Sequence, residues 1–454
     1  MRLEAFRATA LNHLATVDVA FDESLTFITG INGTGKTSVL NGIMALLTPS
    51  LSLLDDLSFS TIEVRFSVDG KSHTVKALKS SGSITLSVAG VSDPVSFAQY
   101  TPVDEDDFFD AQDTKSHYYQ EISSENAGNR TLRFLNSIPT PVFLGIDRRY
   151  RGVSRKRRTR TRGSARGRLA FGTALINSLN QAIELAEGEF AETQASRGRL
   201  SRDFVRDLLL ELIDVPLPSP SFGGFDAPSP GDRKQLSEAF NSIRRFPKVE
   251  GITANDVTTR VQPTLSKVND AVKLIPEDFD ISKIASNTPE DHRVIEALLI
   301  WNSFKPNLGR IAGLSRLVAD YNKRVAGVET SISSYVNLLD KFLTDSGKSI
   351  GFNDRGILEI RISDRALVPE ELSSGEAQIF VLLTHLSFNE AAQAAGVFII
   401  DEPELSLHVQ WQEILVSSLL KANPSIQYIL ATHSPSIILD NIENAKDLTK
   451  FARA

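Results

Sequence analysis

The chain has 454 residues, more than one ordinary domain, which predicts two packed units or one large domain with an insertion. Its 41 % apolar and 23 % charged residues are typical of a globular protein, and its net charge of −7 argues against a protein that coats nucleic acid. The absence of cysteine excludes disulfides, thiolate metal sites and a cysteine nucleophile. With no signal peptide and no apolar run of about 18 residues, we expect a cytosolic protein outside the membrane.

The first 29 residues are predicted to form strands. Val17 to Phe21 alternates apolar and polar residues, and Leu25 to Thr29 is a short buried run. Three more alternating segments, separated by Asp69-Gly70 and Ser81-Gly82, predict hairpins and an antiparallel side sheet. These segments are 62–68, 74–78 and 84–88.

A phosphate-loop pattern, Gly30-Ile31-Asn32-Gly33-Thr34-Gly35-Lys36-Thr37, lies between the buried run 25–29 and a predicted helix at 38–47. Such a loop offers backbone N–H groups and the positive end of the helix dipole to one anion. Lys36 can reach the β- and γ-phosphates of ATP, and the Thr37 hydroxyl can bind Mg²⁺. The candidate nucleotide-binding residues here are Asn32, Gly33, Thr34, Gly35, Lys36, Thr37 and Ser38.

The strongest shift in composition is from Arg148 to Arg168, where eleven of 21 residues are Lys or Arg and none is acidic. It follows an acidic loop at 104–110 and a predicted buried strand at 141–146. The basic stretch can contact the phosphate backbone of nucleic acid, dock an acidic partner, or be a solvated loop. Arg148 and Arg149 directly follow the strand, so they can also point toward the nucleotide or a neighbouring subunit.

The middle of the chain, from Ala170 to Ser346, is predicted to be mainly helical, with a Pro-, Ser- and Gly-rich loop at 216–232. No heptad repeat is sustained, so we expect a compact helical insertion rather than a long coiled-coil arm. The helical segments are expected near 170–187, 200–213, 233–246, 262–274, 290–303 and 311–344.

From Gly356 the pattern returns to alternating strands and helices. We expect strands at 357–362, 397–400 and 428–431, and helices from Leu372 to about Ala394 and from Leu407 to Leu420. The second strand ends in Asp401-Glu402-Pro403-Glu404, and the third ends in Thr432-His433-Ser434-Pro435.

The pair Asp401-Glu402 is predicted to complete a nucleotide site, because ligands bind at the carboxyl ends of parallel strands. Asp401 can hold Mg²⁺ opposite Thr37, and Glu402 can act as general base toward a water in line with the γ-phosphate. Adjacent strand residues face opposite ways, so both can serve only where the strand ends, and Pro403 supports a turn there. Alone, such a pair would be read as a surface turn.

The run Leu372-Ser373-Ser374-Gly375-Glu376 combines a helix cap with a possible anion site, because a Ser-Gly helix start can do both. We predict contact with phosphate for Ser373, Ser374, Gly375 and Glu376. His433 could donate a hydrogen bond to the γ-phosphate, although a lone histidine is more often structural.

Together, the phosphate loop, Leu-Ser-Ser-Gly-Glu, Ile-Ile-Asp-Glu-Pro-Glu and Ala-Thr-His-Ser resemble an ABC-type ATPase head of the SMC, RecF and OLD-like kind, over about 1–150 and 350–445. The resemblance implies an α/β fold, a mixed sheet with an antiparallel side sheet formed by 1–150 and 351–454. It does not match the helical middle, for which the residue pattern predicts a compact helical insertion at 151–350. It also implies a head-to-head dimer, in which Ser373, Ser374 and Gly375 contact the γ-phosphate held by the partner's phosphate loop. The OLD-like branch usually has proline where this chain has Val409, and the family's Mg²⁺-contacting glutamine is not placed.

The resemblance extends to stand-alone ATPase subunits of bacterial antiviral systems such as Septu and PARIS, which work with a separately encoded nuclease. Little chain follows His433, so we expect no C-terminal nuclease domain of the OLD kind. The expected function is an ATP- and Mg²⁺-dependent switch that dimerises and regulates a partner nuclease. The alternatives are a DNA repair or maintenance ATPase that grips DNA through Arg148–Arg168, and the ATPase subunit of a transporter.

Overall fold

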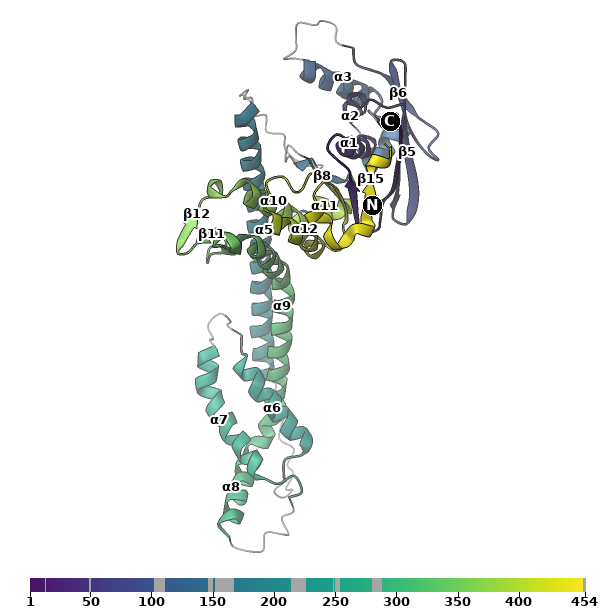
Figure 1. Ribbon diagram of the computed structural model, residues 1–454. Helices are drawn as coiled ribbons and strands as arrows, with labels where there is room; N and C mark the ends of the chain where they lie inside the picture. The colour runs from purple at the N-terminus through teal and green to yellow at the C-terminus, as the bar shows by residue number, and fades with distance from the viewer. Residues whose placement is uncertain are drawn as a thin grey trace. The chain divides into compact units, whose positions relative to one another are not determined.

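The computed structural model (Figure 1) divides by contacts into two units. The head unit comprises residues 1–189 and 334–454, and the helical unit comprises residues 190–333, fewer than the expected insertion 151–350. The residues that the structure describes are 1–12, 14–48, 50–101, 111–145, 150–151, 167–213, 226–247, 249, 254–279 and 288–451. The acidic loop at 104–110, Arg148, Arg149 and most of the basic stretch lie outside them.

The central sheet of the head unit is parallel except at one edge. Its order is β15 (Ala445–Asp447), β3 (Leu25–Thr29), β14 (Gln427–Thr432), β13 (Val397–Asp401), β8 (Val142–Leu144) and β9 (Tyr150–Arg151), and only β8 and β9 pair antiparallel. Every residue of β13 and β14 is buried, as expected for strands covered on both faces. Because β14 lies between β3 and β13, its carboxyl end separates the phosphate loop from the acidic pair.

The predicted hairpins belong to a second, fully antiparallel sheet. Its order is β2 (Thr16–Ala20), β1 (Arg2–Thr9), β4 (Thr61–Val68), β5 (Lys71–Ser80), β6 (Ser83–Val88) and β7 (Val95–Ala98). The helix after the phosphate loop, α1 (Lys36–Leu47), has nine buried residues and shares one apolar core with both sheets. The side chain of Gln427 links the sheets, because it donates to the Leu3 carbonyl at 2.8 Å and accepts from the Leu3 N–H at 2.7 Å.

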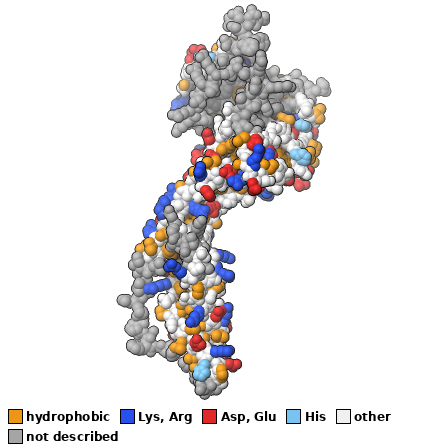
Figure 2. Space-filling model, turned by 90° about the vertical axis from the view of Figure 1, so that its left-hand side faces the viewer, with side chains coloured by type: hydrophobic (Ala, Val, Ile, Leu, Met, Phe, Trp, Pro, Cys, Tyr) orange, Lys and Arg blue, Asp and Glu red, His pale blue; other side chains and the backbone are white. Residues whose placement is uncertain are grey.

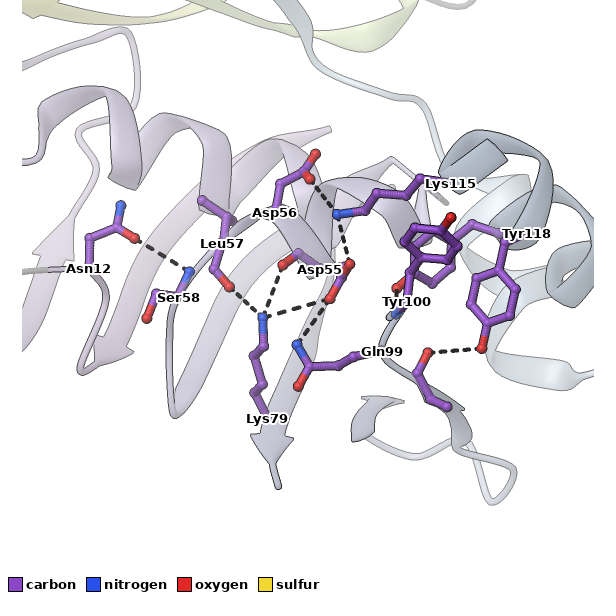
Figure 3. Close-up of polar contacts among 12 residues, drawn as sticks. Asn12, Asp55, Asp56, Leu57, Ser58, Lys79, Gln99, Tyr100, Lys115 and Tyr118 are labelled. Atoms are coloured by element: carbon purple, nitrogen blue, oxygen red, sulfur yellow. Dashed lines mark hydrogen bonds and ion pairs between the residues drawn. The ribbon is translucent and has the colours of Figure 1, made fainter. Parts of the chain in front are cut away.

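A polar network joins α2 (Leu51–Asp56) and β5 to α3 (Ala111–Glu125), as Figure 3 shows. The Asp55 carboxylate, 6 % exposed, accepts from Gln99 at 3.0 Å and pairs with Lys115 at 2.7 Å. Lys79 donates to the backbone carbonyls of Asp55 and Leu57 at 3.0 and 2.7 Å. The network therefore attaches α3 to the antiparallel side sheet. The next helix in the chain is α4 (Arg130–Ser137).

The C-terminal part of the head unit begins with a small antiparallel sheet of β10 (Lys348–Phe352), β11 (Leu358–Ile362) and β12 (Arg365–Leu367). The expected helix from Leu372 to about Ala394 is two helices, α10 (Ser374–Phe388) and α11 (Glu390–Ala395). The break is at Asn389, whose side chain accepts from the first backbone N–H groups of α11. The remaining helices here are α12 (Val409–Ala422) and α13 (Pro435–Ile438), with short 3₁₀ turns at 344–346, 369–371, 439–444 and 448–451.

The helical unit contains α6 (Pro230–Arg244), α7 (Ala254–Leu274) and α8 (Pro289–Phe304), and parts of α5 (Gly167–Ile213) and α9 (Leu308–Leu343); a 3₁₀ turn at 305–307 joins α8 to α9. Within it, α5 and α9 run antiparallel side by side (Figure 1). Arg197 pairs with Glu329 at 3.0 Å, and the rings of Phe204 and Tyr321 lie 4.7 Å apart. The expected break between residues 187 and 200 is wrong, because α5 is continuous over 47 residues. None of the described helices has both the length and the apolar character needed to cross a bilayer.

Candidate nucleotide site

The phosphate loop has the backbone that its glycines allow. Gly30, Gly33 and Gly35 have φ values of +148°, +88° and +88°, and a Cβ on Gly30 would lie 2.4 Å from Thr34 Oγ1. The loop therefore closes as predicted, directly after β3. A cavity of about 300 Å³ opens at the start of α1 and is lined by Asn32, Gly33, Gly35, Lys36, Thr37, Ser38 and Glu402.

Lys36 lies almost fully buried at this cavity, with 4 % of its side chain exposed. Its Nζ donates to the Gly30 carbonyl at 3.0 Å and lies 3.4 Å from Glu402 Oε1. A buried ammonium group needs such partners. This cation and the N-terminus of α1 face the same space, so the cavity fits the phosphates of a nucleotide.

The side chains of Thr37 and Asp401, the predicted Mg²⁺ ligands, are in direct contact. The Thr37 hydroxyl donates to Asp401 Oδ2 at 2.8 Å, while Asp401 Oδ1 is buried without a hydrogen-bond partner among the described residues. Burial raises the pKa of Asp401 to about 6, and the hydrogen bond from Thr37 opposes that shift. A hydroxyl beside a carboxylate with an unsatisfied oxygen fits Mg²⁺, which prefers hard oxygen ligands.

The turn after β13 brings Asp401 and Glu402 to the same site. Asp401 is the last residue of the strand, and Glu402 has a φ of +50°, which is unusual for a residue with a side chain. The prediction that the strand ends at Asp401-Glu402 and turns there is therefore confirmed. Glu402 lines the phosphate cavity, where its carboxylate can reach a water molecule.

His433 follows β14 and lies between the phosphate loop and the acidic pair. Its Nδ1 is 2.6 Å from Glu402 Oε2 and 2.9 Å from Glu404 Oε1. Burial opposes ionisation of Glu402, but hydrogen bonds to Glu404 and His433 and the charge of Lys36 lower its pKa below the ordinary value. Burial raises the pKa of Glu404. Glu402 lines the phosphate cavity and Glu404 does not, so Glu402 is the better candidate for the base.

Sequence reasoning gave no role to two residues of this site. Glu404 belongs to the Asp-Glu-Pro-Glu run, which supports the family resemblance only as a whole motif. Asn12, in the turn between β1 and β2, donates from Nδ2 to Ser38 Oγ at 2.6 Å. It also accepts from the Ser58 N–H at 3.4 Å, as Figure 3 shows. A single asparagine in a turn carries no signal for such a contact.

Ser373 and Ser374, the two serines of the Leu-Ser-Ser-Gly-Glu run, lie outside the phosphate cavity. Ser373 caps α10, and its hydroxyl accepts from the Glu376 N–H at 3.3 Å. Ser373 and Ser374 are exposed, and neither lines the cavity at α1. Gly375 is packed so closely that a Cβ would lie 2.4 Å from the Ser406 carbonyl oxygen. Within one chain, the structure does not bring these residues to the phosphate loop.

Glu376 requires a correction, because its carboxylate is already engaged. It is 3 % exposed, accepts from Lys348 Nζ at 2.7 Å and from the Ser346 hydroxyl at 2.8 Å, and closes the capping box through the Ser373 N–H. We therefore assign Glu376 to the start of α10 and to its attachment to β10, rather than to direct contact with phosphate.

Two family models match the chain. One is described as "AAA domain" and matches residues 1–192; the other is described as "AAA domain, putative AbiEii toxin, Type IV TA system" and matches residues 245–440. The chain carries a P-loop ATPase domain. The two matches include the phosphate loop and the motifs from Ser373 to His433.

Two curated relatives of this ATPase domain are named as retron ATPases. "Retron Vc95 probable ATPase" of Vibrio cholerae serotype O1 biovar El Tor is 34 % identical over 76 residues, 15 % of each chain. "Retron Ec83 probable ATPase" of Escherichia coli is 28 % identical over 167 residues, 32 % of this chain and 30 % of the relative. The chain thus matches less than a third of the length of either relative.

Solved structures similar to the chain include SMC heads at low sequence identity. The Pyrococcus furiosus Smc head bound to the C-terminal domain of ScpA is 11 % identical with a TM-score of 0.38, and the SMC head from Thermotoga maritima is 12 % identical with a TM-score of 0.37. Each comparison covers 98 % of this chain and 93 % of the other. Since these scores are low, the α/β assignment rests on the two sheets and the phosphate loop.

Proposed function

We propose that the chain is a cytosolic ATP-binding and ATP-hydrolysing switch subunit that dimerises head to head. The observation that supports this most is the position of Ser373 and Ser374. They are exposed at the start of α10 and lie outside the phosphate cavity, so a second copy can present them to the nucleotide. Such a pairing is isologous, with two equivalent composite sites.

Apolar residues beside the cavity support the same proposal. Ile31 and Ile442 are 73 % and 74 % exposed, and both border a second cavity of about 620 Å³ that also includes Asn32 and His433. Exposed apolar groups next to a catalytic site favour cover by another surface. A second head joined through ATP would provide that cover.

In the proposed reaction, water attacks the γ-phosphorus and ADP leaves with the electrons of the broken P–O bond. The backbone of the phosphate loop and Lys36 bind the β- and γ-phosphates, and Glu402 accepts the proton from the attacking water. Thr37 and Asp401 would hold Mg²⁺, which neutralises charge on the phosphates. His433 would donate a hydrogen bond to the γ-phosphate.

We further propose that the switch regulates a separately encoded nuclease in bacterial antiviral defence. Among the described residues, the one cluster of metal-binding side chains is Glu402, Glu404 and His433, which belongs to the ATP site. The proposal places the nuclease activity on a partner. The family description that names a toxin–antitoxin system and the relatives named as retron ATPases support a role within a multi-component system.

The test compares association of the full chain with and without ATP and Mg²⁺ by size-exclusion chromatography with light scattering. Glu402→Gln should accumulate the ATP-joined dimer, because it keeps nucleotide binding and slows proton transfer. Lys36→Ala should stay apart under the same conditions. Equal association of Glu402→Gln with and without ATP would contradict a nucleotide-joined dimer.

The alternative, an ATPase of DNA repair or maintenance, depends on the basic stretch Arg148–Arg168. The helical unit adds no net positive charge for binding DNA, because residues 190–333 contain 19 Lys or Arg and 19 Asp or Glu. On the face shown in Figure 2, basic side chains of this unit are interspersed with acidic and apolar ones. Salt-sensitive DNA binding that is lost when these arginines are neutralised would favour this alternative.

A further inference from the structure

Glu404 is a buried acid that the proposed reaction does not use. It lies three residues beyond Asp401, past the turn at Glu402, and its side chain is 6 % exposed. Its backbone carbonyl accepts from the Leu407 N–H at 3.0 Å, which places it within a short ordered turn rather than in a free loop. A carboxylate is costly to bury, so its contacts indicate what it does.

One oxygen of Glu404 contacts His433 twice. Oε1 accepts from the His433 backbone N–H at 2.8 Å and lies 2.9 Å from the ring Nδ1. A hydrogen bond to the backbone fixes where the residue sits after β14, and a contact to the ring fixes the direction of the imidazole. Glu404 therefore restrains both the backbone and the imidazole ring of His433.

Glu402 also contacts the ring, but it has other partners. Its Oε2 lies 2.6 Å from Nδ1, while its Oε1 faces Lys36 at 3.4 Å and the carboxylate lines the phosphate cavity. Lys36 and Glu402 must both become available to nucleotide and water. Glu404 does not line that cavity, so its hold on His433 does not compete with the nucleotide.

We propose that Glu404 is a positioning residue, which holds His433 in place for the γ-phosphate while Glu402 acts on water. This inference rests on the ATPase function proposed above. Glu404 acts through His433 and touches no reacting atom. Its role resembles that of a carboxylate that orients a catalytic histidine, where the acid sets the tautomer and direction of the ring.

A cation held by Glu402, Glu404 and His433 is the competing explanation, because their ligand atoms lie within 4.8 Å of one another. The two explanations differ for Glu404→Gln. The amide oxygen of glutamine can still accept from the backbone N–H and the ring of His433. Glutamine is a weak metal ligand, so a cation site would be damaged by Gln and by Ala alike.

The first experiment measures steady-state ATP hydrolysis by the full chain. Glu404→Ala should lower kcat about 10- to 100-fold and leave KM within about threefold, whereas Glu404→Gln should retain most of the activity. In a His433→Ala background, Glu404→Ala should cost nothing further. Glu413→Ala is the matched control, since Glu413 is an exposed acid on α12 and should not change kcat. Additive losses, or a Gln variant as impaired as the Ala variant, would overturn the proposal.

The second experiment does not need hydrolysis. Hydrogen–deuterium exchange of the nucleotide-free chain should show faster exchange of the His433 amide in Glu404→Ala and parental exchange in Glu404→Gln and Glu413→Ala. Unchanged exchange in Glu404→Ala would contradict the positioning role. If the parent binds ATP but does not hydrolyse it, the proposed ATPase reaction fails, while this exchange result still decides whether Glu404 positions His433.

Discussion

The buried carboxylate of Asp401 destabilises the nucleotide-free protein at neutral pH. One of its oxygens is buried without a partner among the described residues, and burial raises its pKa to about 6. The folded protein therefore binds a proton that the unfolded chain has already released between about pH 4 and pH 6. Over this window the contribution of Asp401 to stability falls as pH rises, and at neutral pH it opposes folding.

We predict that Asp401→Asn stabilises the protein in the absence of Mg²⁺ and nucleotide. The shift of about two units corresponds to a gain of up to about 3 kcal/mol in the free energy of unfolding at pH 7.5. Urea titrations at pH 7.5 and pH 5 measure this gain, which should shrink at the lower pH. A variant less stable than the parent at pH 7.5 would contradict the account. Mg²⁺-dependent nucleotide binding should be weakened by the same change.

At the residue scale, the local motifs could be predicted and the partners of buried acids could not. Lys36, Thr37 and Asp401 follow from residue types at fixed spacing next to predicted strands. Glu376 and Glu404 differ, because their partners Lys348 and His433 are 28 and 29 residues away in the sequence. Only the folded arrangement decides whether such an acid faces a ligand or a neighbouring side chain.

At the element scale, an ion pair between β10 and α10 attaches the start of α10 to the small antiparallel sheet. Lys348 and Glu376 are 13 % and 3 % exposed and lie 2.7 Å apart. We predict that Lys348→Met leaves the carboxylate buried without its cation and lowers the free energy of unfolding by about 3 kcal/mol. The double variant Lys348→Met, Glu376→Met should regain most of this loss. Urea titration tests both, and a double variant as unstable as the single one would show that the pair is not coupled.

Element types could largely be predicted from the sequence, but their limits and order in space could not. Alternation and apolar runs predict the hairpins, α1 and the buried strands, because each depends on neighbouring residues. The continuity of α5 through residues 187–200 depends on packing against α9, which a local pattern does not contain. The position of β14 between β3 and β13 is likewise set by the sheet and brings His433 closer to both motifs than chain order indicates.

At the scale of the whole molecule, the proposed function depends on two features of the head unit. One is a phosphate cavity with Lys36, Thr37 and Glu402. The other is an exposed helix start at Ser373 and Ser374 that the same chain does not bring to this cavity. In the proposed dimer, a nucleotide shared by two copies would use both features.

The most direct test mixes two inactive variants. Lys36→Ala removes phosphate binding, and Ser374→Arg should block the helix start while its own phosphate loop still binds a fluorescent ATP analogue. Each variant alone should show neither ATP-dependent association nor hydrolysis. Because neither variant pairs with itself, the dimers in an equal mixture are mixed and each has one intact composite site, so up to about half of the parental sites should return. A mixture as inactive as its components, or a Ser374→Arg variant as active as the parent, would contradict the shared site.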